Sequence, residues 1–299
     1  MSISRNKDYA ILRVSKFMKA ILVKAFTKDK NQGNPAGVIF DADKLQEHRM
    51  IEISKTLGFS ESAFIVKSDK AKFGIRFFTS TQEVDLCGHA TIAAAHALLK
   101  KRKIYLGREK SKTVTFETRV GIISVEVSKD GLIVMTQTEP QFWGDEHSRN
   151  EVARLLGISM GEIMDYPIQT VSTGTPKLMV GVDSLKTLFK IKPDLEGMKI
   201  YCKEHLVKGF YPFTTETMDK DSDFHARQFN PLAGIDEDPI TGVAAGALGA
   251  YAVEHKISDK KEFTIEQGYC MEKGGKMHVT VDDKVKVGGY AVIFGEKEM

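Results

Sequence analysis

The sequence predicts an α+β fold of two related lobes, each a β-sheet wrapped around one apolar helix. Three observations predict it: strand-like segments outnumber helical ones, two helical segments lack a polar face, and turn motifs recur in both halves of the chain. The two apolar segments, 88–99 and 242–253, consist almost entirely of Ala, Gly, Leu, Ile and Val. A surface helix shows a polar face, so we expect each of these helices to be covered on every side.

The other elements follow from composition and spacing. Strands are expected where Val, Ile, Phe and Thr are enriched between Gly or Asp turns. These segments are 19–26, 37–40, 62–67, 73–79, 113–118, 120–127, 131–136, 177–182, 262–266, 276–281 and 285–293. Helical periodicity marks 44–57, 89–101, 148–156, 194–206, 242–255 and, more weakly, 184–189.

Lobe boundaries are placed between these elements. We expect an N-terminal lobe over 18–137, a C-terminal lobe over 138–287, and strand 288–295 as a candidate to complete the first lobe. Residues 1–17 precede the first strand and are expected to be an extension outside the fold. The alternative is that their apolar residues add to a sheet edge.

Composition excludes several classes of protein. A hydrophobic content of 42% with 28% charged residues is typical of a soluble globular protein. The net charge of +3 is small and the basic residues are interleaved with acidic ones, so no nucleic-acid partner is expected. No stretch is long enough to span a membrane, and no membrane partner is expected. Three cysteines are too few for a disulfide scaffold and fit a reducing cytoplasm.

The two halves share short motifs. Cys87-Gly88-His89-Ala90 opens the first apolar helix, and Thr241-Gly242-Val243-Ala244 opens the second. Upstream, the segments 33–38 and 173–178 each form a Gly- and Pro-containing turn before a strand. This pattern indicates an ancient duplication.

Helix starts carry unpaired N–H groups and positive dipole character, and so favour an anion. Two such starts facing one cleft would place a ligand between the lobes.

Glu61 is the first candidate for chemistry. It follows an amphipathic helix and lies between Phe59 and Phe64 in the sequence, where partial desolvation would suit a general base. The simpler alternative is an exposed turn glutamate.

His89, at the first helix start, is suited to donate or accept a hydrogen bond, with a capping or core histidine as the alternative. His96, two turns further along, is expected to be structural, because that spacing on one helix does not suit a shared metal. We expect no metal site.

Asp238 belongs to an acidic turn before the second apolar helix. Pro239 keeps it out of helical geometry, so its side chain can face the cleft or serve as the N-cap of the helix. Cys87 is either a thiolate activated by the helix start or a small buried hydrophobe. No phosphate-binding glycine motif is present, and no cofactor is expected.

Taken together, an ordered series of motifs resembles the PhzF-like (phenazine biosynthesis-like) family of isomerases over about residues 18–295. The motifs are Gly33-Asn34-Pro35-Ala36-Gly37-Val38, Ser60-Glu61-Ser62-Ala63-Phe64, Phe77-Phe78-Thr79, Glu83-Val84, Leu86-Cys87-Gly88-His89-Ala90-Thr91, Arg227-x-Phe229-x-Pro231, Gly234-Ile235-x-Glu237-Asp238-Pro239-x-Thr241-Gly242 and Gln267-Gly268.

The resemblance implies the diaminopimelate-epimerase fold, with two pseudo-symmetric lobes of strongly curved sheet around a central helix. It also implies cofactor-free proton-shift chemistry on a small anionic metabolite. By position, Glu61 matches the acid/base, and Gly88, His89 and Asp238 match residues that line the pocket and orient the substrate. Thr241, Gly242 and Cys87 are expected to contribute to substrate binding. A homodimer is expected for the family.

One departure concerns the second helix start. The family often has Ser after Thr-Gly, and this chain has Val243, so a hydroxyl near the substrate is lost. The expected function is therefore an isomerase of unidentified substrate with Glu61 as acid/base. Two alternatives stay open: an epimerase or racemase that uses Cys87, and a metabolite-binding protein without catalysis.

Overall fold

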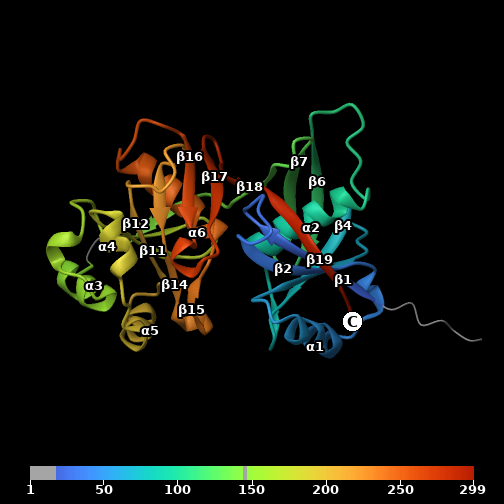
Figure 1. Ribbon diagram of the computed structural model, residues 1–299, viewed down its shortest axis with the longest axis horizontal. Coiled ribbons are helices and arrows are strands. Elements are labelled where there is room, and N and C mark those ends of the chain that lie inside the picture. Colours follow the sequence, from blue (N-terminus) through green and yellow to red (C-terminus); the bar gives the residue numbers. More distant parts are fainter. Residues whose placement is uncertain (1–17, 144–146) are drawn as a thin grey trace, which may run out of the picture.

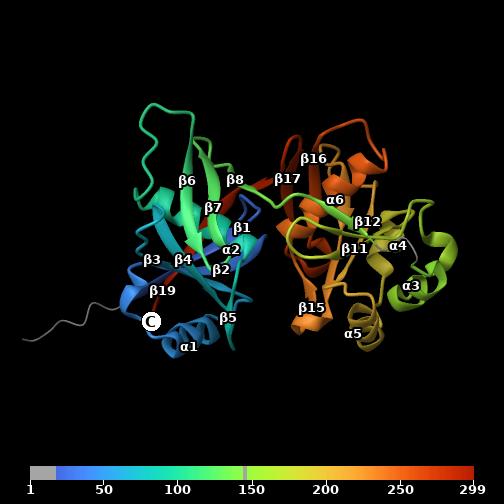
Figure 2. The ribbon, with the colours of Figure 1, turned by 180° about the vertical axis from the view of Figure 1, so that it is seen from behind.

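The structure is a computed structural model that describes residues 18–143 and 147–299. The expected extension over 1–17 lies outside the described residues. Two lobes lie side by side, one built around α2 (Gly88–Lys100) and the other around α6 (Gly242–Glu254) (Figures 1 and 2). The α+β fold expected from the sequence, with two lobes that each surround one apolar helix, is therefore present.

The N-terminal lobe wraps its strands around α2, with α1 (Glu47–Leu57) on the outside. Its strands are β1 (Lys19–Ala25), β2 (Asn34–Ile39), β3 (Ser62–Val66), β4 (Phe73–Phe78), β5 (Glu83–Val84), β6 (Ser111–Thr118), β7 (Gly121–Ser128), β8 (Ile133–Thr136) and β19 (Ala291–Glu298). Most neighbours pair antiparallel, and β2–β3 and β4–β6 pair parallel.

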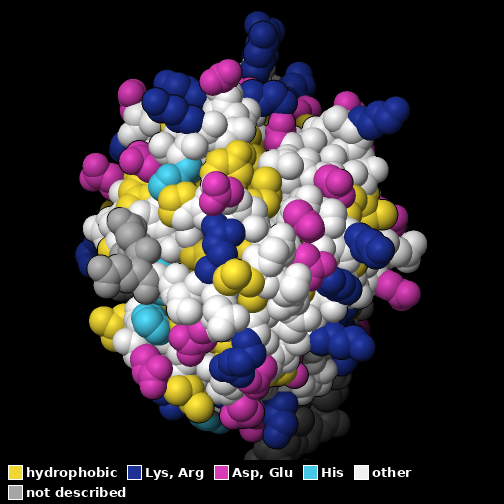
Figure 3. Space-filling model, turned by 90° about the vertical axis from the view of Figure 1, so that its left-hand side faces the viewer, with side chains coloured by type: hydrophobic (Ala, Val, Ile, Leu, Met, Phe, Trp, Pro, Cys, Tyr) yellow, Lys and Arg dark blue, Asp and Glu magenta, His cyan; other side chains and the backbone are white. Residues whose placement is uncertain are grey.

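The C-terminal lobe repeats this arrangement around α6. Its strands are β9 (Gln141–Trp143), β10 (Gln169–Ser172), β11 (Lys177–Gly181), β12 (Phe210–Thr214), β13 (Phe224–Ala226), β14 (Gln228–Asn230), β15 (Ile235–Asp238), β16 (Glu262–Gln267), β17 (Gly275–Val281) and β18 (Val285–Gly289). The helices α3 (Arg149–Leu156), α4 (Leu185–Lys190) and α5 (Leu195–Glu204) lie at its outer end (Figure 1). On that face, basic and acidic side chains are interspersed (Figure 3).

The chain returns to the N-terminal lobe at its last strand. β18 pairs with β17 of the C-terminal lobe and with β8 of the N-terminal lobe. After Tyr290, β19 pairs along the whole of β1, from Lys19 opposite Glu298 to Ala25 opposite Ala291. The expected single strand over 285–293 is therefore two strands, and the break at Tyr290 is where the chain passes between lobes.

Both central helices are buried as their composition requires. Ten of the thirteen residues of α6 are buried, and so are ten of the thirteen of α2. Glycines let strands approach α6 closely: a Cβ on Gly249 would lie 2.5 Å from a methyl group of Val279. The apolar composition of these helices thus reflects contact with the sheet on all sides.

Phe26 fills the junction between the lobes. Its ring would lie 3.1 Å from a Cβ on Gly242 and 2.4 Å from one on Gly289. Its backbone carbonyl accepts a hydrogen bond from the N–H of Lys276 at 2.9 Å, and its φ of 65° is left-handed. A left-handed non-glycine residue is uncommon, and Phe26 is held in this conformation by contacts with the C-terminal lobe.

Several expected elements differ from those observed. The helix expected over 44–57 is a 3₁₀ turn at Ala42–Lys44 followed by α1. The sequence did not predict β5, β9, β10 or β12–β15. β12 contains Pro212, which normally argues against a strand interior, and most of the others have only three or four residues. Among the described residues, no helix is both long and apolar enough to cross a membrane.

Candidate active site

One pocket of about 150 Å³ between the lobes brings together all seven site residues expected from the sequence. The N-terminal lobe supplies Glu61, Cys87, Gly88 and His89, and the C-terminal lobe supplies Asp238, Thr241 and Gly242. Larger hollows, of about 240 to 420 Å³, lie elsewhere. None of these contains any of the seven residues.

Glu61 is held where α1 leads into β3. Gly58 ends α1 with a left-handed φ of 72°, and the chain then reverses into the strand. The Glu61 side chain is 17% exposed and its Oε2 lies 3.6 Å from Nε2 of His89. Phe59 packs on Phe294 and Phe64 on Phe78, so both aromatics belong to the cluster under α1. A partly desolvated carboxylate that still reaches the pocket is suited to proton transfer.

His89 connects two side chains across its ring. Its Nδ1 lies 3.4 Å from Sγ of Cys87, and its Nε2 faces Glu61 without making a hydrogen bond within the described part of the chain. The residue is 7% exposed. A buried ring nitrogen that makes no hydrogen bond to the described protein residues is available to a ligand.

Cys87 is a packed thiol in this structure. Burial raises its pKa well above the usual value, and the neighbouring Glu61 carboxylate raises it further. Hydrogen bonds from the backbone N–H groups of Ala90 and His89 lower the pKa, but by less. A thiol with a raised pKa stays protonated at neutral pH and is a poor base. Of the two interpretations that the sequence left open, the geometry favours the small buried residue.

Glu61, Cys87 and His89 each place a ligand-type atom within 4.8 Å of the others. The two contacts of His89 use opposite ring nitrogens, however, with Nδ1 toward the thiol and Nε2 toward the carboxylate. One metal ion needs a single imidazole nitrogen directed at the point that the other ligands share. The arrangement, with polar contacts on the two sides of the ring, does not suit a metal centre.

Asp238 is fixed by partners from both lobes. Its Oδ1 accepts a hydrogen bond from Nδ2 of Asn34 at 3.1 Å, and its Oδ2 accepts one from the hydroxyl of Thr241. Burial raises the pKa of Asp238 and Glu61 adds to this, whereas His89, the Thr241 hydroxyl and Lys177 lower it. Of the two roles that the sequence left open for Asp238, facing the cleft agrees with its place in the pocket lining. The role of N-cap belongs to Thr241, whose hydroxyl donates a hydrogen bond to Asp238.

The start of α6 is fixed further by Gln267. Its Oε1 accepts hydrogen bonds from the hydroxyl of Tyr211 at 2.9 Å and from the N–H of Thr241 at 3.2 Å, and its Nε2 donates to the carbonyl of Asp238 at 2.9 Å. The carbonyl of Val243 accepts a hydrogen bond from the Thr173 hydroxyl at 3.0 Å. These contacts hold the first turn of α6 against the pocket, opposite the first turn of α2.

Lys177 also lines the pocket and was not predicted. It opens β11, five consecutive residues that are all buried, and is 2% exposed. Burial lowers the pKa of Lys177 to about 8, although Asp238 and Cys202 raise it. The available signal was a lysine at the first position of the strand predicted over 177–182.

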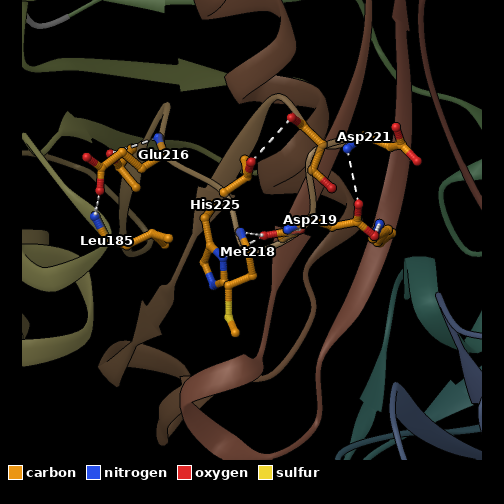
Figure 4. Close-up of polar contacts among 11 residues, drawn as sticks. Leu185, Glu216, Met218, Asp219, Asp221 and His225 are labelled. Carbon is orange, nitrogen blue, oxygen red and sulfur yellow. Dashed lines mark hydrogen bonds and ion pairs between the residues drawn. The ribbon is translucent and has the colours of Figure 1, made fainter.

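A second buried acid–histidine pair lies away from this pocket. Nδ1 of His225 lies 2.9 Å from Oε2 of Glu266, and both side chains are fully buried. Glu266 also accepts hydrogen bonds from the N–H groups of Met218 and Asp219, which lie in the loop beside it (Figure 4). This pair braces a loop and does not line the candidate site.

The comparisons with known proteins agree with the sequence motifs. A family model described as phenazine biosynthesis-like protein (PhzC-PhzF) matches residues 23–297. The chain is 40% identical over 295 residues to an uncharacterized isomerase of Clostridium acetobutylicum, across 93% of this chain and 96% of the relative.

Solved structures extend the similarity to the fold. A PhzF-family phenazine biosynthesis protein of Bacillus anthracis has 34% identity and a TM-score of 0.87, across 95% of this chain and 99% of that one. A hydroxyproline epimerase of Agrobacterium vitis shares the fold alone, with 12% identity and a TM-score of 0.63 across 95% and 91% of the two chains. The similarity covers both lobes and the strand that returns to the first.

Proposed function

The chain belongs to the phenazine biosynthesis-like family of isomerases, and we propose that it shifts a proton on a small carboxylate-bearing metabolite without a cofactor, with Glu61 as acid/base. The single observation that supports the proposal is the position of Glu61. Its carboxylate reaches the pocket beside an unpaired nitrogen of His89, where the first turns of α2 and α6 meet.

In this mechanism Glu61 removes a proton from a carbon next to the substrate carboxylate. The electron pair moves onto oxygen, and the resulting anion is stabilised by the unpaired N–H groups at the helix starts that contain Gly88 and Gly242. Glu61 then returns the proton to a different carbon, so no net proton is gained or lost. A single carboxylate that acts first as base and then as acid suits an isomerase.

We assign His89 the role of hydrogen-bond donor. Because the pKa of Cys87 is raised, its thiol stays protonated and can donate a hydrogen bond to Nδ1 of His89. A neutral imidazole that accepts at Nδ1 carries its own hydrogen on Nε2. That hydrogen faces Glu61 and the pocket, where it can orient the carboxylate or a substrate oxygen.

Asp238 positions the opposite wall. It accepts hydrogen bonds from Asn34 and Thr241, and so connects the N-terminal lobe to the first turn of α6. Val243 lines the pocket where the family often has serine. The substrate is therefore proposed to lack a contact with a hydroxyl at this point, which separates it from substrates of serine-containing relatives.

The test is the substitution Glu61→Gln, which keeps size and hydrogen bonding but cannot accept the proton. The assay uses a co-purifying metabolite or a panel of small carboxylic acids. In D₂O, wild-type protein is expected to exchange an acidic carbon-bound hydrogen of the metabolite, or of one acid in the panel, for deuterium, and mass spectrometry measures the exchange. The variant should lose this exchange by a factor of about 10² or more. Glu204→Gln, at an exposed position on α5, is the matched control.

Retained exchange in Glu61→Gln would refute the assignment of Glu61. Inactivation by alkylation of Cys87, with Glu61→Gln still active, would instead support the epimerase that uses the thiol. Wild-type protein that binds a metabolite but exchanges no hydrogen would favour the non-catalytic alternative.

A further inference from the structure

Lys177 is a buried cation in the candidate pocket that forms no direct polar contact with another side chain of the described residues. It is 2% exposed, and its ammonium group makes no hydrogen bond or ion pair with any residue in 18–143 or 147–299. An ammonium group carries three donors, and burying them unsatisfied is costly. Lysine is almost never fully buried unless it is paired. The pairing group is therefore to be sought outside the protein.

The structure makes room for this ammonium group. A Cβ on Gly209 would lie 3.3 Å from Nζ of Lys177 and 2.5 Å from the carbonyl oxygen of Phe229. Any larger residue at Gly209 would crowd the lysine and the adjacent strand. β11, which carries Lys177, is held between β10 and β12, so the position of the side chain is fixed by the sheet.

Lys177 and Glu61 approach the pocket from different lobes. Glu61 comes from the β3 side of the N-terminal lobe, and Lys177 from β11 of the C-terminal lobe. Asp238 contributes a carboxylate that attracts Lys177 without forming an ion pair with it. The pocket thus has a proton acceptor on one wall and an unpaired positive charge on the other.

We propose that Lys177 binds the carboxylate of the substrate and thereby sets which carbon faces Glu61. The inference rests on the function proposed for this pocket and adds to it a specificity-determining residue. An ammonium–carboxylate hydrogen bond satisfies the orphan donors and is stronger than a neutral one. A ligand without a carboxylate would leave the buried charge unpaired, so the pocket discriminates against neutral analogues.

Binding of the carboxylate is expected to depend on pH through Lys177. The pKa of Lys177 is lowered to about 8 by burial, so above that pH the free protein holds it neutral. Carboxylate binding must then take up a proton, and affinity falls about tenfold per pH unit. The groups that face Lys177 are Asp238 and Cys202, and the pKa of the Cys202 thiol is raised to about 11 by burial. Glu61, Cys87 and His89 face it across the pocket.

The experiment uses sodium crotonate, a small unsaturated carboxylate, and crotonamide, its neutral counterpart. Binding is followed by the backbone amide NMR signals of Gly88 and Gly242, which report from both walls. Wild-type protein should bind crotonate about tenfold or more tightly than crotonamide. Lys177→Met should bind crotonate more weakly than wild type by the same factor, so that the preference disappears. Its affinity for crotonamide should be unchanged.

Two further variants separate charge from fold. Lys177→Arg keeps the charge, so it should retain the preference for crotonate, and its crotonate affinity should not decline above pH 8. Lys24 is another strand lysine whose pKa is lowered by burial, but it lies outside the pocket. Lys24→Met should therefore bind both compounds as wild type does.

Three results would overturn the inference. Lys177→Met could bind crotonate as tightly as wild type, or its crotonate affinity could still decline above pH 8. In the third case, wild-type protein would show no saturable response to crotonate. Glu61→Gln is expected to bind crotonate normally and to lose hydrogen exchange. Failure of the Lys177 inference therefore shows in binding, and failure of the proposed function shows in exchange.

Discussion

His96 is a buried histidine outside the candidate pocket. It lies in the middle of α2, 4% exposed, and its Nδ1 has no hydrogen-bond partner among the described residues. Burial, and then the charge of Lys100, lower the pKa of His96 to about 4. The ring is therefore neutral in the folded protein at neutral pH, which agrees with the structural role expected from its spacing to His89.

This gives a prediction for stability in acid. Below pH 6.5 the unfolded chain protonates His96 while the folded protein resists protonation down to about pH 4, so the free energy of unfolding falls as the pH falls through this range. The loss amounts to at most about 3 kcal/mol. His96→Met should remove it, as measured by urea unfolding between pH 4 and 6.5. His48→Met, exposed on α1, is the control; parallel pH profiles for wild type and His96→Met would contradict the prediction.

At the residue scale, the sequence predicted the acidic residues and the histidine of the pocket but not its positively charged residue. Glu61, His89 and Asp238 were found because they lie in short motifs next to helix starts, where chemistry is expected. Lys177 was missed because a lysine in an apolar strand reads as a surface position until the strand is known to border a pocket. The role of Asn34 in holding Asp238 depends on a contact between lobes, which no local pattern encodes.

At the scale of elements, α6 depends on its glycines for packing. A Cβ on Gly249 would lie 2.5 Å from Cγ1 of Val279 and 3.2 Å from Cγ2 of Val281. Alanine has a helix propensity about 1 kcal/mol better than glycine, while overpacking a core costs about 1–3 kcal/mol. The steric effect is expected to dominate.

Gly249→Ala should therefore lower the free energy of unfolding by about 1–2 kcal/mol, measured by denaturant titration. Adding Val279→Ala removes the clashing methyl groups, so the double variant should lose less than the sum of the two single variants. Gly161→Ala, where a Cβ meets nothing within 4 Å, should change stability by about 0.5 kcal/mol or less. A stabilised Gly249→Ala would show that propensity outweighs packing here.

The two central helices were predictable because their lack of a polar face admits only a buried location. Most long strands were predictable for a similar reason, since each has a run of β-forming residues between turn residues. β12 was not, because Pro212 interrupts its pattern, yet it pairs with β11 in parallel. The short strands β13–β15 have too few residues to show a period and exist because their neighbours pair with them.

At the scale of the molecule, β19 makes the N-terminal lobe depend on residues from beyond the C-terminal lobe. It pairs with β1 over its length, and α2 packs against it. Removing residues 291–299 should leave β1 with an unpaired edge and expose the apolar side of α2. Hydrogen exchange is expected to show lost protection in β1 and β2, while α6 keeps more of its protection.

The exposed substitution Glu298→Ala serves as the control for this truncation, and it should leave the exchange pattern unchanged. Equal protection of β1 in the truncated and full-length proteins would contradict the prediction. The result would mean that the N-terminal lobe is stable without its last strand.

The return of β19 also sets the order of events during translation. Domains of a growing chain commonly fold as they emerge, the N-terminal one first. Here the first lobe stays incomplete until the ribosome has released every strand of the second, and the contacts that close it join residues far apart in sequence. Until β19 is made, β1 therefore has an open sheet edge, and such an edge is a template for pairing with another chain.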